Sequence, residues 1–484
     1  MGLVVPVEPV PLARLGRVHF AAVGGAGMSG IARIMLARGV PVSGCDSAPS
    51  PQLDELAALG ARVGVGHSAD HLAAADTLVI SSAIRADNPE LRAARARGML
   101  VLHRAAALAS VMLGRQGIAV AGTHGKTTTT GMITTVLRAC GADPGYVIGG
   151  ILAETGLGAE DGTGRAFIAE ADESDGSFLM LAPDAAVVTS VEADHLDNYA
   201  SLAEIEAAFE AFAGGITQGG LLVTSSDDPG AAKVAAAART QARPAGSLRT
   251  VTYGESEAAD YRLTAITLAG MATEFELAPG GASVVAGSDP VSLRVGVPGK
   301  HNALNAAAAY ATVAELGFAG GDIAGGLAAY RGTQRRMELK GEADAVRVID
   351  SYAHHPTEIA ADLAAAREIA AGGRVLVVFQ PHLYSRTRIF AAEFGAALGR
   401  ADEIFVLDVY AAREDPEPGV SGALIARAVP GGRGTFWPER QSVPRAIADV
   451  AKPGDVVLTM GAGDVTQLGP QIVAALGARA DGGG

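Results

Sequence analysis

Short apolar runs alternate with longer amphipathic stretches along the first hundred residues of the chain. Runs rich in Val, Leu and Ile, which suit buried strands, lie at residues 18–23, 40–45 and 78–81. Helices are expected to begin after these runs, at Ser29, Pro51 and Asn88. This alternation of strand and helix predicts a parallel sheet covered by helices, which is the α/β class.

The alternation returns in two further segments. The second opens with the strand-like run 116–122, continues as a helix to about Cys140, and has later strands at residues 166–172 and 185–194. Residues 214–300 contain the short β-like runs LLVTSS, RTVTYG, YRLTAITL and VSLRVGV, and the next stretch reads as one helix that ends at Gly317. The third segment has strands at residues 346–350, 374–380, 403–408 and 455–460. We therefore predict three α/β domains, with boundaries near residues 112 and 332.

Composition and charge narrow the class of protein. The chain has 484 residues and a net charge of −14, which disfavours a nucleic-acid partner because such proteins normally carry a basic face. No apolar run reaches 18 residues, so no membrane span is expected, and the N-terminus lacks the basic start of a secretion signal. Cys45 and Cys140 are far apart and in no metal-binding spacing, which suits a reducing cytoplasm.

The first glycine-rich loop follows the first predicted strand. Gly25, Gly27 and Gly30 fit the G-x-G-x-x-G pattern, which lets the backbone approach a diphosphate at the start of a helix. Asp46 stands where an acid that binds a ribose hydroxyl is expected. Taken alone, this loop indicates a dinucleotide such as NAD.

A second glycine-rich loop, GTHGKTTTT, follows the strand expected at residues 117–121. Its backbone N–H groups suit phosphate oxygens, Lys126 suits the terminal phosphates, and the Thr127 hydroxyl suits Mg²⁺. The full P-loop pattern is not met, because Val120 occupies its first glycine position. The shorter G-T-x-G-K-T match still predicts a nucleotide triphosphate site.

Two acidic clusters follow the next two predicted strands of the same segment. One comprises Glu170, Asp172, Glu173 and Asp175, and the other comprises Glu192, Asp194, His195 and Asp197. The carboxyl ends of parallel strands meet at one sheet edge, so these groups are expected near the second loop. Oxygen ligands of this kind suit Mg²⁺ bound together with a nucleotide.

These segments resemble those of the Mur ligases, the ATP-dependent amino-acid ligases of peptidoglycan synthesis. The matching segments are GGAGMSGIA, SSAIRADNPE, AGTHGKTTT, EADESDGSF, EADHLDNY, GKHNALNAAAA, RRMELKG, YAHHPTEI and QPHLYSRTR. The resemblance implies a Rossmann-like UDP-substrate domain at residues 1–112, a P-loop-type ATPase domain at 113–332 and a Rossmann-like amino-acid domain at 333–484. It further implies ATP, Mg²⁺, UDP-N-acetylmuramate and L-alanine as ligands.

The resemblance also assigns roles to individual residues. The residues implied to bind the UDP substrate are Gly25, Ala26, Gly27, Met28, Ser29, Asp46 and Ser82. Those implied to bind ATP are Gly122, Thr123, His124, Gly125, Lys126, Thr127, Thr128, Asn302, Asn305 and Arg336. Thr127, Glu170 and His195 are the implied Mg²⁺ ligands, Lys126, His195 and Arg336 the implied catalytic residues, and His355, Arg386 and Arg388 the candidates near the amino acid.

Two positions depart from the family pattern. Several members carry a modified lysine on the helix after the histidine motif, whereas this chain has Phe209, so the metal shell is expected to be completed by water. The family often has Asp directly before the tyrosine of YAHHP, whereas this chain has Ser351 there and Asp350 one residue earlier. Adjacent strand residues point to opposite faces, so which of the two takes that role stays open.

Three other functions stay open at this point. An NAD-dependent oxidoreductase would use the first loop, but it would leave the second loop and the acidic clusters without a role. A sibling ligase that adds a free murein tripeptide would share both loops and differ in its C-terminal pocket. A nucleotide-binding scaffold without turnover would not need Lys126, Glu170 and His195 together. We expect a cytoplasmic monomer or weak homodimer.

Overall fold

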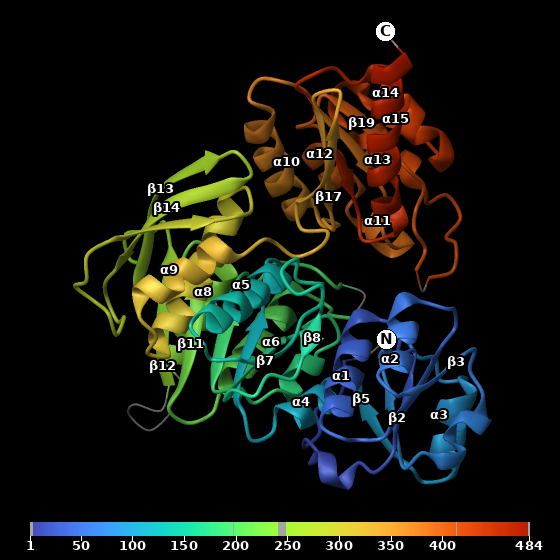
Figure 1. Ribbon diagram of the computed structural model, residues 1–484, viewed down its shortest axis with the longest axis vertical. Coiled ribbons are helices and arrows are strands. Elements are labelled where there is room, and N and C mark those ends of the chain that lie inside the picture. The colour runs from blue at the N-terminus through green and yellow to red at the C-terminus, as the bar shows by residue number, and fades with distance from the viewer. Residues whose placement is uncertain (1–2, 197, 241–247, 413, 483–484) are drawn as a thin grey trace. The chain divides into compact units, whose positions relative to one another are not determined.

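The computed structural model describes residues 3–196, 198–240, 248–412 and 414–482 (Figure 1). Its strands form three sheets, of five, ten and six strands, which confirms the α/β prediction. The chain folds as two compact units: Met1–Ala265 with Phe275–Arg294 and Leu304–Tyr330, and Ile266–Glu274 with Val295–Ala303 and Arg331–Gly484. The proposed domain boundaries at residues 112 and 332 stay predictions, and each lies at the end of a helix or in a connection.

The five-stranded sheet forms the N-terminal domain and has the order β3-β2-β1-β4-β5. Its strands are β1 (Val18–Ala21), β2 (Val42–Asp46), β3 (Arg62–Val65), β4 (Thr77–Ile80) and β5 (Leu100–His103). All its pairings are parallel. The strand order reverses beside β1, and such a switch point opens a crevice for ligands at the carboxyl ends of the strands.

Helices cover both faces of this sheet, as Figure 1 shows. One face carries α1 (Ala26–Ala37), α2 (Pro51–Ala58) and α4 (Arg104–Met112), and the other carries α3 (Pro89–Ala96) and the 3₁₀ helix η2 (Ala69–Ala74). The predicted starts of α2 and α3 are correct within one residue. The predicted start of α1 at Ser29 is wrong by three residues, because this helix includes Gly27 and Gly30, where tertiary neighbours leave little room for a side chain.

The ten-stranded sheet has the order β15-β14-β13-β12-β11-β10-β6-β9-β7-β8. Its strands are β6 (Gln116–Ala121), β7 (Gly145–Val147), β8 (Ala159–Glu160), β9 (Ala166–Glu170), β10 (Ala185–Val188), β11 (Gly220–Ser225), β12 (Leu248–Gly254), β13 (Tyr261–Ala269), β14 (Ala272–Pro279) and β15 (Val291–Val295). Strand β6 lies between β9 and β10 and is parallel to both. The second glycine loop, which follows β6, is therefore flanked by the two acidic clusters that follow β9 and β10.

The helices of this segment are α5 (Lys126–Ala139), α6 (Leu202–Gly214), α7 (Pro229–Thr240), α8 (Lys300–Glu315) and α9 (Gly320–Ala329). Helix α8 ends before Gly317, as predicted. Helix α7 and strand β14 were missed by the sequence analysis, which predicted only short β-like runs between residues 214 and 300. The alanine-rich sequence of α7 has high helix propensity but weak amphipathic periodicity.

The six-stranded sheet forms the C-terminal segment, with the order β16-β17-β21-β18-β19-β20. Its strands are β16 (Glu338–Ala343), β17 (Val346–Ser351), β18 (Val375–Phe379), β19 (Glu403–Val406), β20 (Gly434–Phe436) and β21 (Val456–Met460). The four predicted strands of this segment, β17, β18, β19 and β21, are confirmed. Strand β16 pairs with β17 in the antiparallel sense, and it was not predicted.

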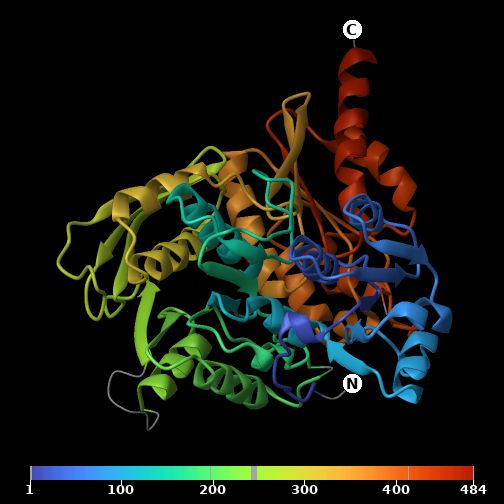
Figure 2. The same ribbon diagram turned by 60° about the horizontal axis from the view of Figure 1, so that its bottom comes forward.

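Helices again cover both faces of the C-terminal sheet. One face carries α10 (Pro356–Ala370), α12 (Ala391–Leu398) and α13 (Gly422–Ala428), and the other carries α14 (Val443–Val450) and α15 (Leu468–Gly482). A short helix, α11 (Tyr384–Ile389), follows β18, and Figure 2 shows α15 in red as the last helix. Within the described residues, no helix combines the length and the apolar character that crossing a membrane requires.

Candidate active site

The first glycine loop connects β1 to α1 at the carboxyl edge of the N-terminal sheet. Two backbone amides anchor it to β2: Val23 N donates to the Cys45 carbonyl at 2.9 Å, and Gly24 N donates to Asp46 Oδ2 at 2.9 Å. Asp46 therefore holds the loop itself, in addition to standing where a ribose-binding acid was predicted. A Cβ placed on Gly25 would meet no atom within 4 Å, so a ligand can approach this backbone.

The other predicted residues of this loop lie in the first turn of α1. Ala26, Gly27 and Met28 follow Gly25 directly, and the Ser29 hydroxyl donates to the Ala26 carbonyl at 3.1 Å. The free N–H groups of a helix start favour an anion. The geometry therefore agrees with a diphosphate site.

Arg104 is a candidate site residue that the sequence analysis missed. It is the first residue of α4 and follows β5, so it stands at the same sheet edge as the first loop. A Cβ on Gly27 would lie 3.2 Å from Arg104 Nη1, and Arg104 Nη2 donates to Asp172 Oδ2 at 2.6 Å. Arg104 thus connects the first glycine loop to the acidic cluster after β9. Strand β5 was not among the predicted strands, so no predicted element marked Arg104 as a site residue.

Electrostatics keep this pair charged. Burial by itself lowers the pKa of Arg104, but Asp172 outweighs burial and raises it above the ordinary value. Burial likewise opposes ionisation of Asp172, yet Arg104 and then Lys126 and His195 hold the pKa of this carboxyl well below its usual range. A partly buried cation beside the first loop suits an anionic substrate.

The second glycine loop admits only glycine at two positions. Gly122 and Gly125 have φ values of 135° and 82°, in the left-handed region. A Cβ on Gly122 would lie 2.1 Å from Thr189 Oγ1, and one on Gly125 would lie 2.5 Å from Asn305 Oδ1. Asn305, predicted to contact ATP, therefore lies beside this loop, where it also accepts from Thr129 Oγ1 at 3.2 Å.

Lys126 begins α5 and folds back over the loop. Its Nζ donates to the Gly122 carbonyl at 2.6 Å and to Glu173 Oε1 at 2.8 Å. Burial alone lowers the pKa of Lys126, but Glu173 overcomes this and raises it, so the lysine carries its charge. The second oxygen of Glu173, Oε2, is buried without a hydrogen-bond partner among the described residues. Glu173 is therefore a stronger site candidate than the sequence indicated.

The remaining loop residues are held by the segment after β10. His124 N donates to Ser190 Oγ at 3.0 Å, and Glu192 N donates to Thr123 Oγ1 at 2.9 Å. Thr128 is buried in the first turn of α5. These contacts fix the backbone that was predicted to hold the phosphates.

Two of the three predicted metal ligands are in contact. Thr127 Oγ1 donates to Glu170 Oε1 at 3.1 Å, and Gly149 N donates to Glu170 Oε2 at 2.7 Å. A hydroxyl and a carboxylate are the hard oxygen donors that Mg²⁺ prefers, so these two residues fit that ion.

The third predicted ligand, His195, lies beside other carboxylates. Its Nε2 is 3.7 Å from Glu173 Oε1 and 3.6 Å from Asp194 Oδ2, and its φ is 53°. Glu173 and Asp194 therefore lie within ion-pair distance of His195, and Asp197 lies outside the described residues.

Ser82, the last predicted substrate residue, contacts the central acidic cluster. Its hydroxyl donates to Asp175 Oδ2 and lies 3.0 Å from His103 Nε2. Burial lowers the pKa of His103 below its ordinary value, although Asp175 opposes this effect. Ser82 and Arg104 therefore both link the N-terminal sheet to the segment after β9.

The C-terminal candidates Arg336, His355 and Arg386 belong to the second unit. The guanidinium of Arg336 lies 5.1 Å from the Tyr352 ring centroid and 3.9 Å from Glu358. His355 is the N-cap of α10 and accepts from Thr357 N at 3.4 Å. Arg386 is buried in α11.

Arg388 and Asn302, two further residues to which the family resemblance assigns roles, have different surroundings. Arg388 is exposed and pairs with Glu417 at 2.9 Å, as a surface ion pair does. Asn302, in the same unit, donates from Nδ2 to the Pro298 carbonyl at 2.7 Å. This side-chain bond to the backbone lies at the start of α8, so Asn302 also has a structural role there.

Asp350 and Ser351 face different partners, as adjacent strand residues do. Asp350 is fully buried and receives bonds from Thr459 at 2.6 Å, Thr466 at 2.7 Å and Arg335 at 3.2 Å. Ser351 donates to the carboxylate of Asp362. Both side chains thus have partners that organise the sheet edge.

Three family models match successive parts of the chain. They are described as "Mur ligase family, catalytic domain" for residues 17–116, "Mur ligase middle domain" for residues 120–313 and "Mur ligase, glutamate ligase domain" for residues 335–463. Along the chain, the three matched ranges come in the same order as the three sheets.

Similar proteins span the whole chain. The UDP-N-acetylmuramate–L-alanine ligase of Thermobifida fusca (strain YX) is 56% identical over 99% of this chain and 100% of its own length. That of Kineococcus radiotolerans is 55% identical over 97% and 98%. A solved structure of UDP-N-acetylmuramate–alanine ligase from Thermotoga maritima matches with a TM-score of 0.79 at 28% identity, covering 97% of this chain and 100% of that chain. A murein peptide ligase from Psychrobacter arcticus matches with a TM-score of 0.70 at 23% identity over 96% and 99%, which shows the fold alone.

Proposed function

This chain belongs to the Mur ligase family, and we propose from this premise that it joins L-alanine to UDP-N-acetylmuramate at the expense of ATP. The reaction gives ADP and phosphate and belongs to peptidoglycan synthesis. Relatives that are 50–56% identical over nearly the full chain carry this activity in their names.

One observation of the structure supports the proposal above all. Two phosphate-type loops lie in one compact unit, and Arg104 of the N-terminal sheet pairs with Asp172 of the sheet that carries the second loop. A ligase of this kind must hold two anionic substrates, a UDP-sugar and ATP. The first loop suits the UDP diphosphate, and the second suits the phosphates of ATP.

The chemistry has two steps on this interpretation. The lactyl carboxylate of UDP-N-acetylmuramate attacks the γ-phosphorus of ATP, giving an acyl phosphate and ADP. The alanine amine then attacks the acyl carbon, and phosphate leaves from the tetrahedral intermediate. Both reactants of the first step are anions, so their repulsion forms a large part of the barrier.

Charged residues of the central sheet would reduce this repulsion. Glu173 keeps Lys126 charged, and Lys126 stands where the terminal phosphates of ATP are expected. When ATP binds, the ammonium group of Lys126 would exchange its contact with Glu173 for one with a phosphate oxygen. Arg104 stands beside the first loop and suits the carboxylate or the diphosphate. Thr127 and Glu170 would hold Mg²⁺, which, when bound, screens the phosphate charge.

Further roles rest on the family pattern. We assign Arg336, Asn302 and Asn305 to ATP, and His195 to a second metal position. His355 and Arg386 are candidates for the amino acid, whereas the surface pairing of Arg388 favours a structural role. Both cysteines are free, which suits the reducing cytoplasm where we place the reaction. We keep the expectation of a monomer or weak homodimer.

The alternatives are weakened by different observations. Family membership accounts for the second loop and the acidic clusters, which a dehydrogenase would leave without a role. Two murein peptide ligases of solved structure are 23% and 25% identical to this chain, whereas the L-alanine ligase of Thermobifida fusca is 56% identical over its full length. Only an activity assay distinguishes the ligase from a nucleotide-binding scaffold without turnover.

The decisive assay measures phosphate release with UDP-N-acetylmuramate, ATP and a panel of L-amino acids. We expect release with L-alanine and much less with the tripeptide L-alanyl-γ-D-glutamyl-meso-diaminopimelate. Release only with the tripeptide would instead identify a recycling ligase, and no release with any acceptor would identify a scaffold.

Lys126→Ala tests the role of the second loop. We expect phosphate release to fall by on the order of 100-fold or more, because the charge that offsets the phosphates is removed. UDP-sugar binding, measured by calorimetry, should change little because the first loop is on another sheet. Lys233→Ala, which removes an exposed lysine, is the matched control. Equal loss of UDP-sugar binding in a folded Lys126→Ala protein would contradict the assignment.

A further inference from the structure

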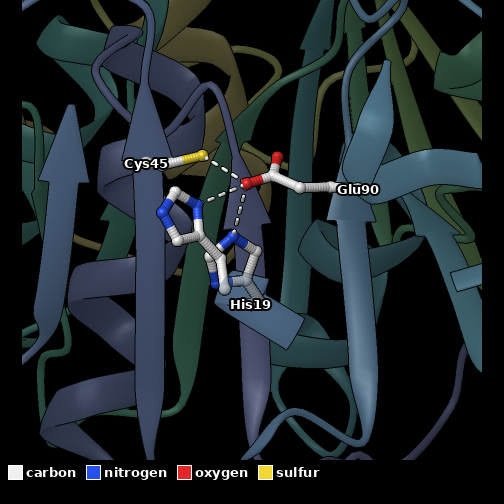
Figure 3. Close-up of side chains that lie close together, drawn as sticks. His19, Cys45 and Glu90 are labelled. Atoms are coloured by element: carbon white, nitrogen blue, oxygen red, sulfur yellow. Dashed lines mark hydrogen bonds and ion pairs between the residues drawn. The ribbon is translucent and has the colours of Figure 1, made fainter. Parts of the chain in front are cut away.

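Four side chains that can bind metals converge inside the N-terminal domain, outside the proposed active site. They come from β1 (His19), the end of β2 (Cys45), η2 (His71) and the start of α3 (Glu90). One ligand atom from each lies within 4.8 Å of all the others. Figure 3 shows His19 and Cys45 pointing at one carboxylate oxygen of Glu90. We call these four residues the HCHE cluster.

Glu90 Oε1 lies at the centre of the HCHE cluster. Cys45 Sγ donates to it at 2.9 Å, and His71 Nδ1 lies 2.7 Å from it. His19 Nε2 is 3.5 Å away. Glu90 has no exposed surface, and Cys45 and His19 are also buried. A fully buried carboxylate at this position needs strong compensation for its lost hydration.

The orientation of His19 points to a ligand in the cluster. Its Nδ1 lies 2.9 Å from Ser43 Oγ, which fixes the ring so that Nε2 faces Glu90. This Nε2 is buried and has no hydrogen-bond partner among the described residues. A buried nitrogen without a partner is unfavourable, and a metal ion that accepts its lone pair would remove that cost.

The charges of the ligand groups suit a divalent ion. On binding, the Cys45 thiol would release its proton, and the two charges of the ion would balance one thiolate and the Glu90 carboxylate.

We propose that the HCHE cluster is a binding site for Zn²⁺, with one ligand from each of its four residues. Two histidine nitrogens, a thiolate and a carboxylate form a mixed set that suits a tetrahedral transition-metal site and not Mg²⁺. Zn²⁺ bonds of about 2.0–2.3 Å would place the ligand atoms about 3.4 Å apart in a tetrahedron. The other three ligand atoms lie 2.7–3.5 Å from Glu90 Oε1, and all four lie within 4.8 Å of one another, so side-chain rotations would bring them to this spacing.

The surroundings provide the support that metal sites need. His67 Nδ1 lies 2.9 Å from Glu90 Oε2 and would orient the carboxylate, as Ser43 orients His19. A cavity of about 290 Å³ lies beside the cluster and is lined by both His19 and His71. His71 is the partly exposed member, with 32% of its side chain accessible.

The site would act on the first glycine loop through Cys45. The Cys45 carbonyl accepts from Val23 N, and the next residue, Asp46, accepts from Gly24 N. A bound ion would tie β1, β2, η2 and α3 together directly behind these anchors. We therefore assign it a stabilising role for the N-terminal domain, separate from the ATP-dependent chemistry.

Cobalt provides the direct test, because Co²⁺ bound to a thiolate has a charge-transfer absorption in the near ultraviolet. Metal-free full-length protein is titrated with Co²⁺ without nucleotide. We expect this absorption to saturate at one Co²⁺ per chain and to disappear when Zn²⁺ is added, while Mg²⁺ leaves it unchanged. Cys45→Ser should abolish it, and Cys140→Ser, which alters the chain's other cysteine, should retain it.

Further variants distinguish the loss of a metal ligand from misfolding of the protein. His71→Ala changes a partly exposed residue, so it should fold and should lose most of the Co²⁺ affinity. His67→Ala should weaken binding by about 10–100-fold, as the loss of a group that orients a ligand does. Zn²⁺ should raise the melting temperature of the wild type and of Cys140→Ser, and not that of His71→Ala.

The alternative is a metal-free cluster in which Glu90 is simply satisfied by hydrogen bonds. No thiolate absorption in the wild type, or the same absorption in Cys45→Ser, would establish this alternative and overturn the proposal. Phosphate release does not enter the test, so its outcome is independent of the proposed ligase activity.

Discussion

Phe209 occupies the helix position at which several family members carry a modified lysine. The side chain is fully buried and lies edge-on to Phe178, with 5.2 Å between ring centroids. It therefore belongs to the hydrophobic core beneath α6 and cannot approach a metal ion. The expectation that water completes the metal shell stays a prediction.

Phe209→Ala should destabilise the protein by about 3–5 kcal/mol, because it removes a buried ring and leaves a cavity. Leu202→Ala, at the exposed start of the same helix, should change stability by less than about 0.5 kcal/mol. Urea unfolding of both variants measures the difference. Equal midpoints would show that Phe209 is not part of a tightly packed core.

At the scale of elements, the strand–loop–helix unit of β6, the second loop and α5 is the most constrained. Its loop passes so close to Thr189 and Asn305 that no side chain fits on either of two glycines. The same closeness brings the backbone amides to one place, where they can surround phosphate oxygens.

Gly125→Ala tests this constraint. The left-handed φ should cost about 1–2 kcal/mol in stability, and the clash with Asn305 should displace the loop and weaken ATP binding. Gly141→Ala is the control, since Gly141 has a similar φ of 75° but open space around its Cβ position. Calorimetry should show weaker ATP binding for Gly125→Ala alone. If both variants bind ATP equally well, the close fit of the loop is not required.

At the scale of the molecule, the first compact unit depends on polar links between its two sheets. Arg104 pairs with Asp172, and Ser82 donates to Asp175. Arg38 adds a third link through a two-bond pair with Asp161, at 2.7 and 2.9 Å. These links hold the first glycine loop and the central acidic cluster in one unit.

The Arg104–Asp172 pair predicts a pH dependence. The pKa of Asp172 is lowered in the folded state, so its contribution is complete above the unfolded value of about 3.9 and is lost as the pH falls below it. Asp172→Asn should therefore narrow the stability difference between about pH 6 and about pH 3, measured by urea unfolding. Asp449→Asn, at a 68% exposed position, should leave the difference unchanged. An unchanged difference in Asp172→Asn would contradict the prediction.

The sequence by itself determined the strand–helix alternation, the three α/β segments and both glycine loops. These features are local: they depend on the spacing of apolar residues and on glycines at turns, which neighbours in the chain specify. Helix α7 and strand β16 were missed because their local patterns are weak, and their formation depends on packing against the sheet. Strand β14 was missed although its buried and more exposed residues alternate.

Only the tertiary structure decided which side chains meet. Arg104 and Asp172 are 68 positions apart, and no spacing rule connects them. Likewise, the two cysteines stand in no metal-binding spacing, yet the order of β1, β2 and α3 in the fold brings Cys45 to His19, His71 and Glu90. Long-range contacts of this kind follow from strand order and helix packing. The sequence pattern indicates the α/β class, but it determines neither the strand order nor the packing.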